Sequence, residues 1–192
     1  MNRRVVSSGL LAGILALAWT AAFQGGLPQR DAWGYKDVPK EAEVLVVLDQ
    51  ALPETGLYLI PGHSPPDSLF RARYESGPIF RIHSLRAGAG GPPHVVFSIL
   101  GLLLAPLLPA WLLGRACHVS EPSFLARAGL VSIFGIVTAL AAHLQLWGTE
   151  LYPLNYTLFL TLNGVAMWIT LGVFLAWRVT PETVGETREH PP

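Results

Sequence analysis

Four stretches of the chain are apolar, free of Asp, Glu, Lys and Arg, and long enough to cross a lipid bilayer. They cover residues 5–23, 95–113, 128–147 and 154–177. An α-helix rises about 1.5 Å per residue, so about 17–25 such residues span a hydrocarbon core of about 30 Å. The charged fraction is 14% over 192 residues, whereas soluble domains carry roughly 25%. The sequence therefore predicts an α-helical integral membrane protein with four transmembrane helices, one before and three after a soluble segment.

The same pattern divides the chain into four regions. Residues 1–23 are predicted as an N-terminal transmembrane anchor, 24–93 as an exported small α/β segment, 94–178 as a three-helix transmembrane bundle and 179–192 as a disordered cytoplasmic tail. Arg3 and Arg4 before an apolar core also fit a secretory signal peptide. The length of that core, with Trp19 and Phe23 near its end, favours an anchor. Both alternatives export the segment that follows.

The arginines of the short connections predict the orientation. They all fall on one side of the predicted membrane: Arg3, Arg4, Arg115, Arg127, Arg178 and Arg188. The one short loop on the opposite side, residues 148–153, contains Glu150 and no basic residue. The positive-inside rule then places both termini in the cytoplasm and residues 24–93 outside it. The preference for Arg over Lys, with much Ala, Gly and Pro, indicates a GC-rich bacterial genome and hence a multi-pass protein of the bacterial inner membrane.

A helix is predicted at the start of the exported segment. Asp37 and Pro39 are residue types that begin helices, as a capping acid and a first-turn proline. An apolar stripe at helical spacing follows, made of Val44, Leu45, Val47, Leu48, Ala51 and Leu52. The stripe predicts a helix over 38–52 that ends at Pro53. The run 44–48 also fits a strand, because periodicity alone does not separate the two.

Two strands are predicted after this helix, at 56–62 and 78–85, with a short helix at 67–74 between them and a linker over 86–93. In the second strand, Phe80 and Ile82 alternate with Arg81 and His83, which predicts one buried and one wet face. The first strand is apolar on both faces, so each face needs a cover. We expect the 38–52 helix on one face, and the membrane helices or a partner on the other.

The residues of the first strand give the predicted interaction surface, which consists of Tyr58, Leu57 and Ile60. Leu57 points to one face of the strand, whereas Tyr58 and Ile60 point to the other. Two strands alone are marginally stable in water. The expected partners are therefore the lipid bilayer and either other membrane proteins or further copies of this chain.

Polar residues inside the predicted spans or at their outer ends form the second candidate site. His94, His143, Gln145 and Asn163 lie in the outer half of the three-helix bundle. On the third span, Ser132, Gly135, Ala139 and His143 form a stripe of small or polar residues, and Thr157, Thr161, Gly164, Trp168 and Gly172 form one on the fourth. Such stripes let membrane helices pack closely, and amide or imidazole groups bond across them. The alternative is a site for a small molecule or quinone, or for haem held by His94 and His143.

No sequence pattern points to catalysis. A nucleophile-and-base pair, a P-loop and an HExxH motif are all absent from the sequence. Cys117 is the single cysteine, and the formal net charge is zero, which argues against nucleic-acid binding. Gly9 and Gly13 form a GxxxG pattern in the first span, a candidate close-packing face for another helix. We therefore expect neither an enzyme nor a bound metal or cofactor.

The layout resembles a group of small uncharacterised bacterial membrane proteins with four spans. Their exported segment carries a Gly-x-Tyr-x-x-Pro pattern after a helix that ends in Ala-Leu-Pro. Here Ala51-Leu52-Pro53 leads into Gly56-Leu57-Tyr58-Leu59-Ile60-Pro61, and Gly77-Pro78 precedes the second strand. The resemblance implies the four-span topology and no particular chemistry. The expected role is a structural or accessory part of a membrane complex that interacts through its exported segment.

Overall fold

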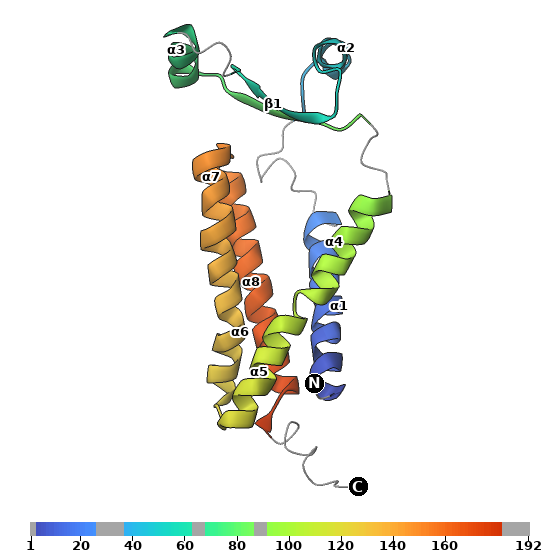
Figure 1. Cartoon of the computed structure of the whole chain (residues 1–192), viewed down its shortest axis with the longest axis vertical. Helices are drawn as coiled ribbons and strands as arrows, with labels where there is room; N and C mark the ends of the chain where they lie inside the picture. The colour runs from blue at the N-terminus through green and yellow to red at the C-terminus, as the bar shows by residue number, and fades with distance from the viewer. Residues whose placement is uncertain (1–2, 26–36, 63–67, 87–91, 182–192) are drawn as a thin grey trace. The chain divides into compact units, whose positions relative to one another are not determined.

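The computed structural model describes residues 3–25, 37–62, 68–86 and 92–181, which are mostly helical (Figure 1). The chain forms two compact units. One combines Met1–Lys36 with Val96–Pro192 and is called the helical unit below, and the other is Asp37–Val95, called the α/β unit.

Four helical stretches in the described residues are long and apolar enough to cross a membrane, which confirms the prediction of a multi-pass membrane protein. They are Arg3–Phe23, Val95–Val119, Phe124–Glu150 and Leu154–Arg178. The elements that build them are α1 (Arg3–Gly25), α4 (Pro92–Leu104), α5 (Leu107–Val119), α6 (Phe124–Thr138), the π-helix η1 (Ala139–His143), α7 (Leu144–Glu150) and α8 (Leu154–Arg178). The second and third spans are longer than the sequence predicts. Many large apolar side chains on these helices are exposed, as lipid-facing residues are.

The second span breaks at a proline. Helix α4 ends at Leu104 and α5 begins at Leu107, because Pro106 has no backbone N–H to continue the ladder. The GxxxG glycines of α1 lie against this break. A Cβ on Gly9 would come within 2.8 Å of the Leu107 side chain, and one on Gly13 within 2.7 Å of the Cα of Leu103. The GxxxG pattern is therefore a packing face used within the chain.

The small-residue stripes of the third and fourth spans face each other, which confirms their predicted packing role. A Cβ on Gly135 of α6 would lie 2.7 Å from the Cβ of Trp168. A Cβ on Gly172 of α8 would lie 2.7 Å from the carbonyl oxygen of Ala128. These distances are too short for any side chain, so α6 and α8 pack closely at both glycines.

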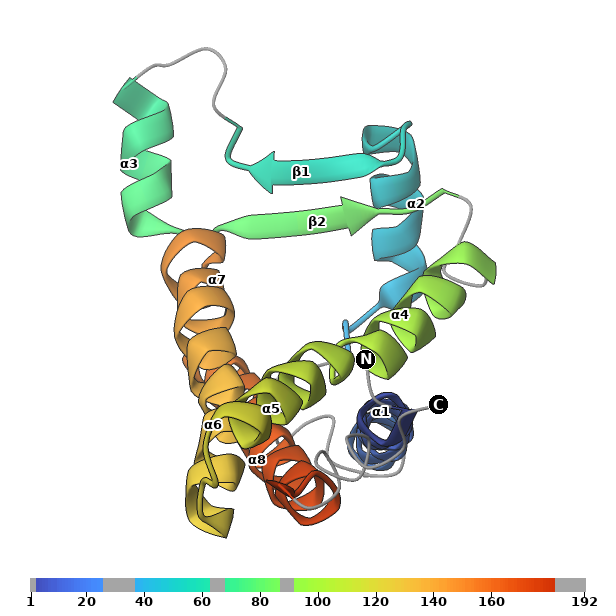
Figure 2. The same cartoon turned by 60° about the horizontal axis from the view of Figure 1, so that its bottom comes forward.

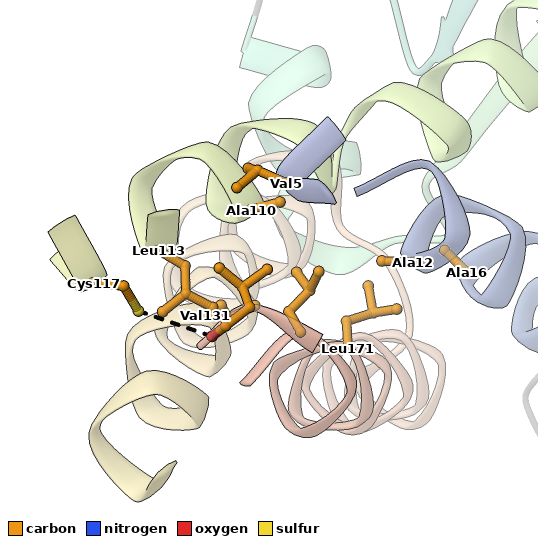
Figure 3. Packing of buried hydrophobic residues seen from close by; sticks show 10 residues of the cluster. Val5, Ala12, Ala16, Ala110, Leu113, Cys117, Val131 and Leu171 are labelled. Carbon is orange, nitrogen blue, oxygen red and sulfur yellow. Dashed lines mark hydrogen bonds between the residues drawn. The ribbon is translucent and has the colours of Figure 1, made fainter. Parts of the chain in front are cut away.

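The core of the helical unit is built from small and medium side chains of four helices (Figure 3). Its members are Val5, Ala12, Ala16, Ala110, Leu113, Cys117, Val131, Leu171, Leu175 and Val179. The Cys117 thiol lies 3.8 Å from the carbonyl oxygen of Val179 and donates to it. Val179, which the sequence assigns to the tail, is thus a core residue. The rest of the predicted tail from 182 onward lies outside the described residues.

The α/β unit contains α2 (Glu41–Ala51), β1 (Gly56–Ile60), α3 (Ser68–Ser76) and β2 (Phe80–Ser84). The two strands are antiparallel, and α2 and α3 lie near opposite ends of them (Figure 2). Residues 44–48 are therefore helical, and the strand alternative is wrong. Pro53 follows the end of α2 as predicted, and Gly56–Ile60 is the expected first strand.

The predicted start of α2 is wrong. The helix begins at Glu41, and the residue before it, Lys40, has a left-handed backbone with φ 59°. This conformation turns the chain into the helix without the Asp37 cap. Acidic Glu41 and Glu43 occupy the first turn, where the helix dipole favours negative charge. The Lys40 ammonium lies 3.3 Å from the Glu43 carboxylate.

Candidate functional site

Asn163 is a structural link between helices in this fold. The indole N–H of Trp19 on α1 donates a hydrogen bond to the Asn163 side-chain oxygen on α8, with 2.9 Å between the two atoms. The Trp19 ring also stacks on Phe23 at 4.8 Å between ring centres. An amide inside a membrane bundle needs such a partner. The contact therefore matches the packing role predicted for Asn163.

Of the other three predicted ligand residues, Gln145 and His143 have described side chains, and these lie in different surroundings. The Gln145 side chain is exposed on α7. His94 lies in the first turn of α4, and its side chain is outside the described part of the chain. His143 packs against α8, with its Nε2 3.4 Å from the place that a Cβ on Gly164 would take. The haem, quinone and small-molecule alternative stays a prediction.

The environment of His143 is the most unusual polar feature of the helical unit. His143 ends the π-helix η1, a local widening that inserts one extra residue and is common at functional sites. Its Nδ1 is buried and has no hydrogen-bond partner among the described residues. The hydroxyl oxygens of Thr157 and Thr161 on α8 are also buried and have no hydrogen-bond partner among the described residues. Thr157 is only 2% exposed.

These polar atoms share one interface. Thr157, Thr161 and Gly164 are spaced by four and three residues, so they lie on one side of α8, and His143 of η1 packs at the Gly164 end of that row. We call His143, Thr157 and Thr161 the polar cluster. The helical spacing of these residues is visible in the sequence, but only the structure shows that their polar atoms lack partners.

The strand register defines the two faces of the sheet. Tyr58 pairs with Ile82 and Ile60 with Phe80, so these four side chains share one face, called the apolar sheet face. Leu57 pairs with His83 and Leu59 with Arg81 on the other face. The side chains of Ile60 and Phe80 are 44% and 51% exposed, and Tyr58 and Ile82 are half-buried.

The prediction that helix α2 covers one face of this sheet is wrong. The face with Phe80 is exposed among the described residues, and its cover by the membrane helices or a partner stays a prediction. Helix α2 does not cover a face of the sheet, because it has no buried residue and Leu45, Val46 and Val47 on it are exposed. The physical reason is that α2 lies at the end of the strands (Figure 2), where it is held by polar contacts.

Arg86 makes these contacts, although the sequence assigns it to a linker. Its guanidinium donates to the Asp49 carboxylate and to the carbonyl oxygens of Asp49 and Leu52, the Asp49 carbonyl bond measuring 2.6 Å. Its backbone N–H donates to the Thr55 hydroxyl at 3.1 Å. The last carbonyls of a helix have no partner within it. Arg86 therefore caps α2 and ties it to the end of β2.

No protein-family model, no curated protein and no solved structure matches the chain. The resemblance to four-span bacterial proteins with a Gly-x-Tyr-x-x-Pro segment stays a prediction.

Proposed function

We propose that the protein is a structural or accessory component of a bacterial inner-membrane complex and that its α/β unit is the interaction module. The observation that carries the proposal is the apolar sheet face, on which Ile60 and Phe80 are 44% and 51% exposed. Contiguous exposed apolar patches mark interaction sites in proteins. A two-stranded sheet is also marginal by itself, so a partner on this face would stabilise the unit.

The chemistry of the two faces indicates the kind of partner. The apolar sheet face carries no charged side chain. The Tyr58 hydroxyl on it donates a hydrogen bond to the carbonyl oxygen of Glu54, with 3.0 Å between the two atoms. The opposite face includes Arg81 and His83. We therefore expect an apolar partner surface, supplied by the exported part of another membrane protein or by a second copy of this chain.

Position-specific photo-crosslinking in the full-length protein tests this proposal. A photoreactive side chain at position 80 should crosslink to one discrete partner band, whereas the same group at 83, also exposed but on the opposite face, should not. Ile60→Asp should remove the crosslink at 80 and reduce the mass of the complex in mild detergent. Arg71→Asp on exposed α3 is the control and should leave both unchanged.

Mass spectrometry of the crosslinked band separates a second copy from a different protein. Equal crosslinking at 80 and 83, or a monomer whose mass Ile60→Asp does not change, would contradict the proposal.

We also propose that both termini are cytoplasmic and that residues 24–93 are extracytoplasmic. The arginines at the ends of the spans support this orientation. Arg3 begins α1, Arg115 lies in α5 near the connection to α6, Arg127 lies in the first turn of α6 and Arg178 ends α8. The turn between α7 and α8, residues 151–153, has no basic residue. The packing of α1 in the core supports an anchor that is retained.

Thiol labelling of spheroplasts tests this orientation. Cys117 is the only cysteine and is 6% exposed, so an introduced cysteine gives the signal. A membrane-impermeant maleimide should label Ser76→Cys on α3 in spheroplasts and Ser120→Cys, after α5, only once the membrane is opened. Labelling of Ser120→Cys but not Ser76→Cys in closed spheroplasts would reverse the orientation.

A further inference from the structure

The polar cluster of His143, Thr157 and Thr161 presents three buried hydrogen-bonding atoms without described partners. In a lipid environment no bulk water replaces a missing partner, so an unpaired polar atom is costly. Thr157 and Thr161 lie one turn apart on α8, and His143 of η1 packs against Gly164, about one turn further along. The three polar atoms therefore need a hydrogen-bond partner from outside the described residues.

Other hydroxyls of the same helices show that the lack of partners is local. Ser132, Thr138 and Thr170 each donate to the carbonyl oxygen four residues earlier, at 2.9, 2.8 and 3.0 Å. This bond within the helix is the usual way in which a membrane helix satisfies a hydroxyl. Thr157 and Thr161 make no such bond. Their hydroxyls are therefore available to a group outside their own turn.

The charge of the surroundings limits what this group can be. Residues 128–149 and 155–177 contain no Asp, Glu, Lys or Arg. The charged residues of these helices stand at their ends, as Arg127, Glu150 and Arg178, so an ion at the cluster would lie away from them, and burial of an unpaired ion is very unfavourable. The occupant is thus neutral. It also has to both donate and accept, because hydroxyls and a neutral imidazole offer both kinds of group.

We propose that the polar cluster holds ordered water molecules, which bond to the His143 Nδ1 and to the hydroxyls of Thr161 and Thr157. Water bound inside proteins typically makes about three hydrogen bonds to groups that are otherwise unsatisfied. Gly164 leaves room for the imidazole ring at one end of the row. The π-turn at Ala139–His143 sets the direction from which the ring approaches α8.

Threonine-to-valine variants of the full-length protein test the proposal, because loss of a water-bonded hydroxyl lowers the Tm and loss of an unbonded one does not. Valine keeps the shape of threonine and removes the hydroxyl. If water occupies the cluster, Thr157→Val and Thr161→Val each lower the Tm in mild detergent by roughly 2–4 °C. Thr138→Val and Thr170→Val are matched controls with hydroxyls bonded in their own helix, and should change the Tm less.

A second measurement detects the water directly. In lipid bilayers, solid-state NMR of the histidine-labelled protein should show polarisation transfer from water to the His143 ring, assigned by its loss in His143→Asn. Thr161→Val should reduce this transfer by half or more, and Thr138→Val should leave it unchanged.

Two results would overturn the proposal. One is that both valine variants are as stable as the wild type or more stable, while Thr161→Val leaves the water transfer unchanged. The other is a lipid-soluble molecule in the native mass spectrum that disappears in His143→Asn, because it would show an organic ligand at the cluster in place of water.

Discussion

Gly172→Ala is expected to destabilise the helical unit by about 1–3 kcal/mol, the usual range for overpacking a close contact. The new Cβ would lie 2.7 Å from the carbonyl oxygen of Ala128 and 3.3 Å from the backbone N of Ser132. Both atoms belong to the backbone of α6, which cannot rotate away as a side chain can. The helices must separate, and the contacts of Val131 and Leu171 in the core weaken with them.

Gly129→Ala is the matched control for this prediction. Nothing lies within 4 Å of a Cβ at Gly129, and alanine is favoured over glycine in a helix by up to about 1 kcal/mol. The control should therefore keep or raise the stability. Thermal unfolding can be followed with a thiol-reactive fluorophore, which reaches buried Cys117 only when the unit opens. Equal midpoints for Gly172→Ala and Gly129→Ala would show that α6 and α8 do not approach this closely.

Arg86→Ala is expected to open the α/β unit while leaving the helical unit intact. The ion pair with Asp49 contributes little, because the two side chains are 36% and 70% exposed and exposed pairs are worth about 0–1 kcal/mol. The bonds to the carbonyl oxygens of Asp49 and Leu52 matter more. Hydrogen bonds that involve a charged group contribute about 1.5–3 kcal/mol, and α2 has no buried residue to hold it otherwise.

Hydrogen–deuterium exchange measures this effect. Amides of α2 and β1 should exchange at least about tenfold faster in Arg86→Ala, since each 1.4 kcal/mol corresponds to a factor of ten. Arg86→Lys should not rescue them, because an ammonium cannot reach several acceptors as the guanidinium fork does. Arg71→Ala removes an exposed pair with Glu75 within α3 and is the control. Unchanged exchange in Arg86→Ala would mean that other contacts hold α2.

The sequence predicts those parts of this fold that depend on local pattern. Apolar length locates the four spans, and the stripes that contain Gly135 and Gly172 identify the helix faces that pack. Alternation in β1 and β2 also predicts which side chains share a face. These features need no knowledge of distant residues.

The features that the sequence does not predict depend on contacts between distant positions. Arg86 and Leu52 are 34 residues apart, and Trp19 and Asn163 are 144 apart, so no local pattern connects them. The left-handed Lys40 overrides the cap expected at Asp37. Helix α2 lies at the end of the strands, where the polar contacts of Arg86 hold it, and no local pattern shows this position.

The π-turn at Ala139–His143 fixes how many residues the third span must have before His143. One extra residue in a helix turns everything after it by about 100°. If one alanine between Leu140 and His143 were deleted, η1 could close into an ordinary α-helix, and α7 would rotate relative to α6. Trp147 would then leave its present side of the helix. Related chains that keep this histidine contact should therefore conserve the number of residues between the glycine at 135 and the histidine, even where the residues themselves change.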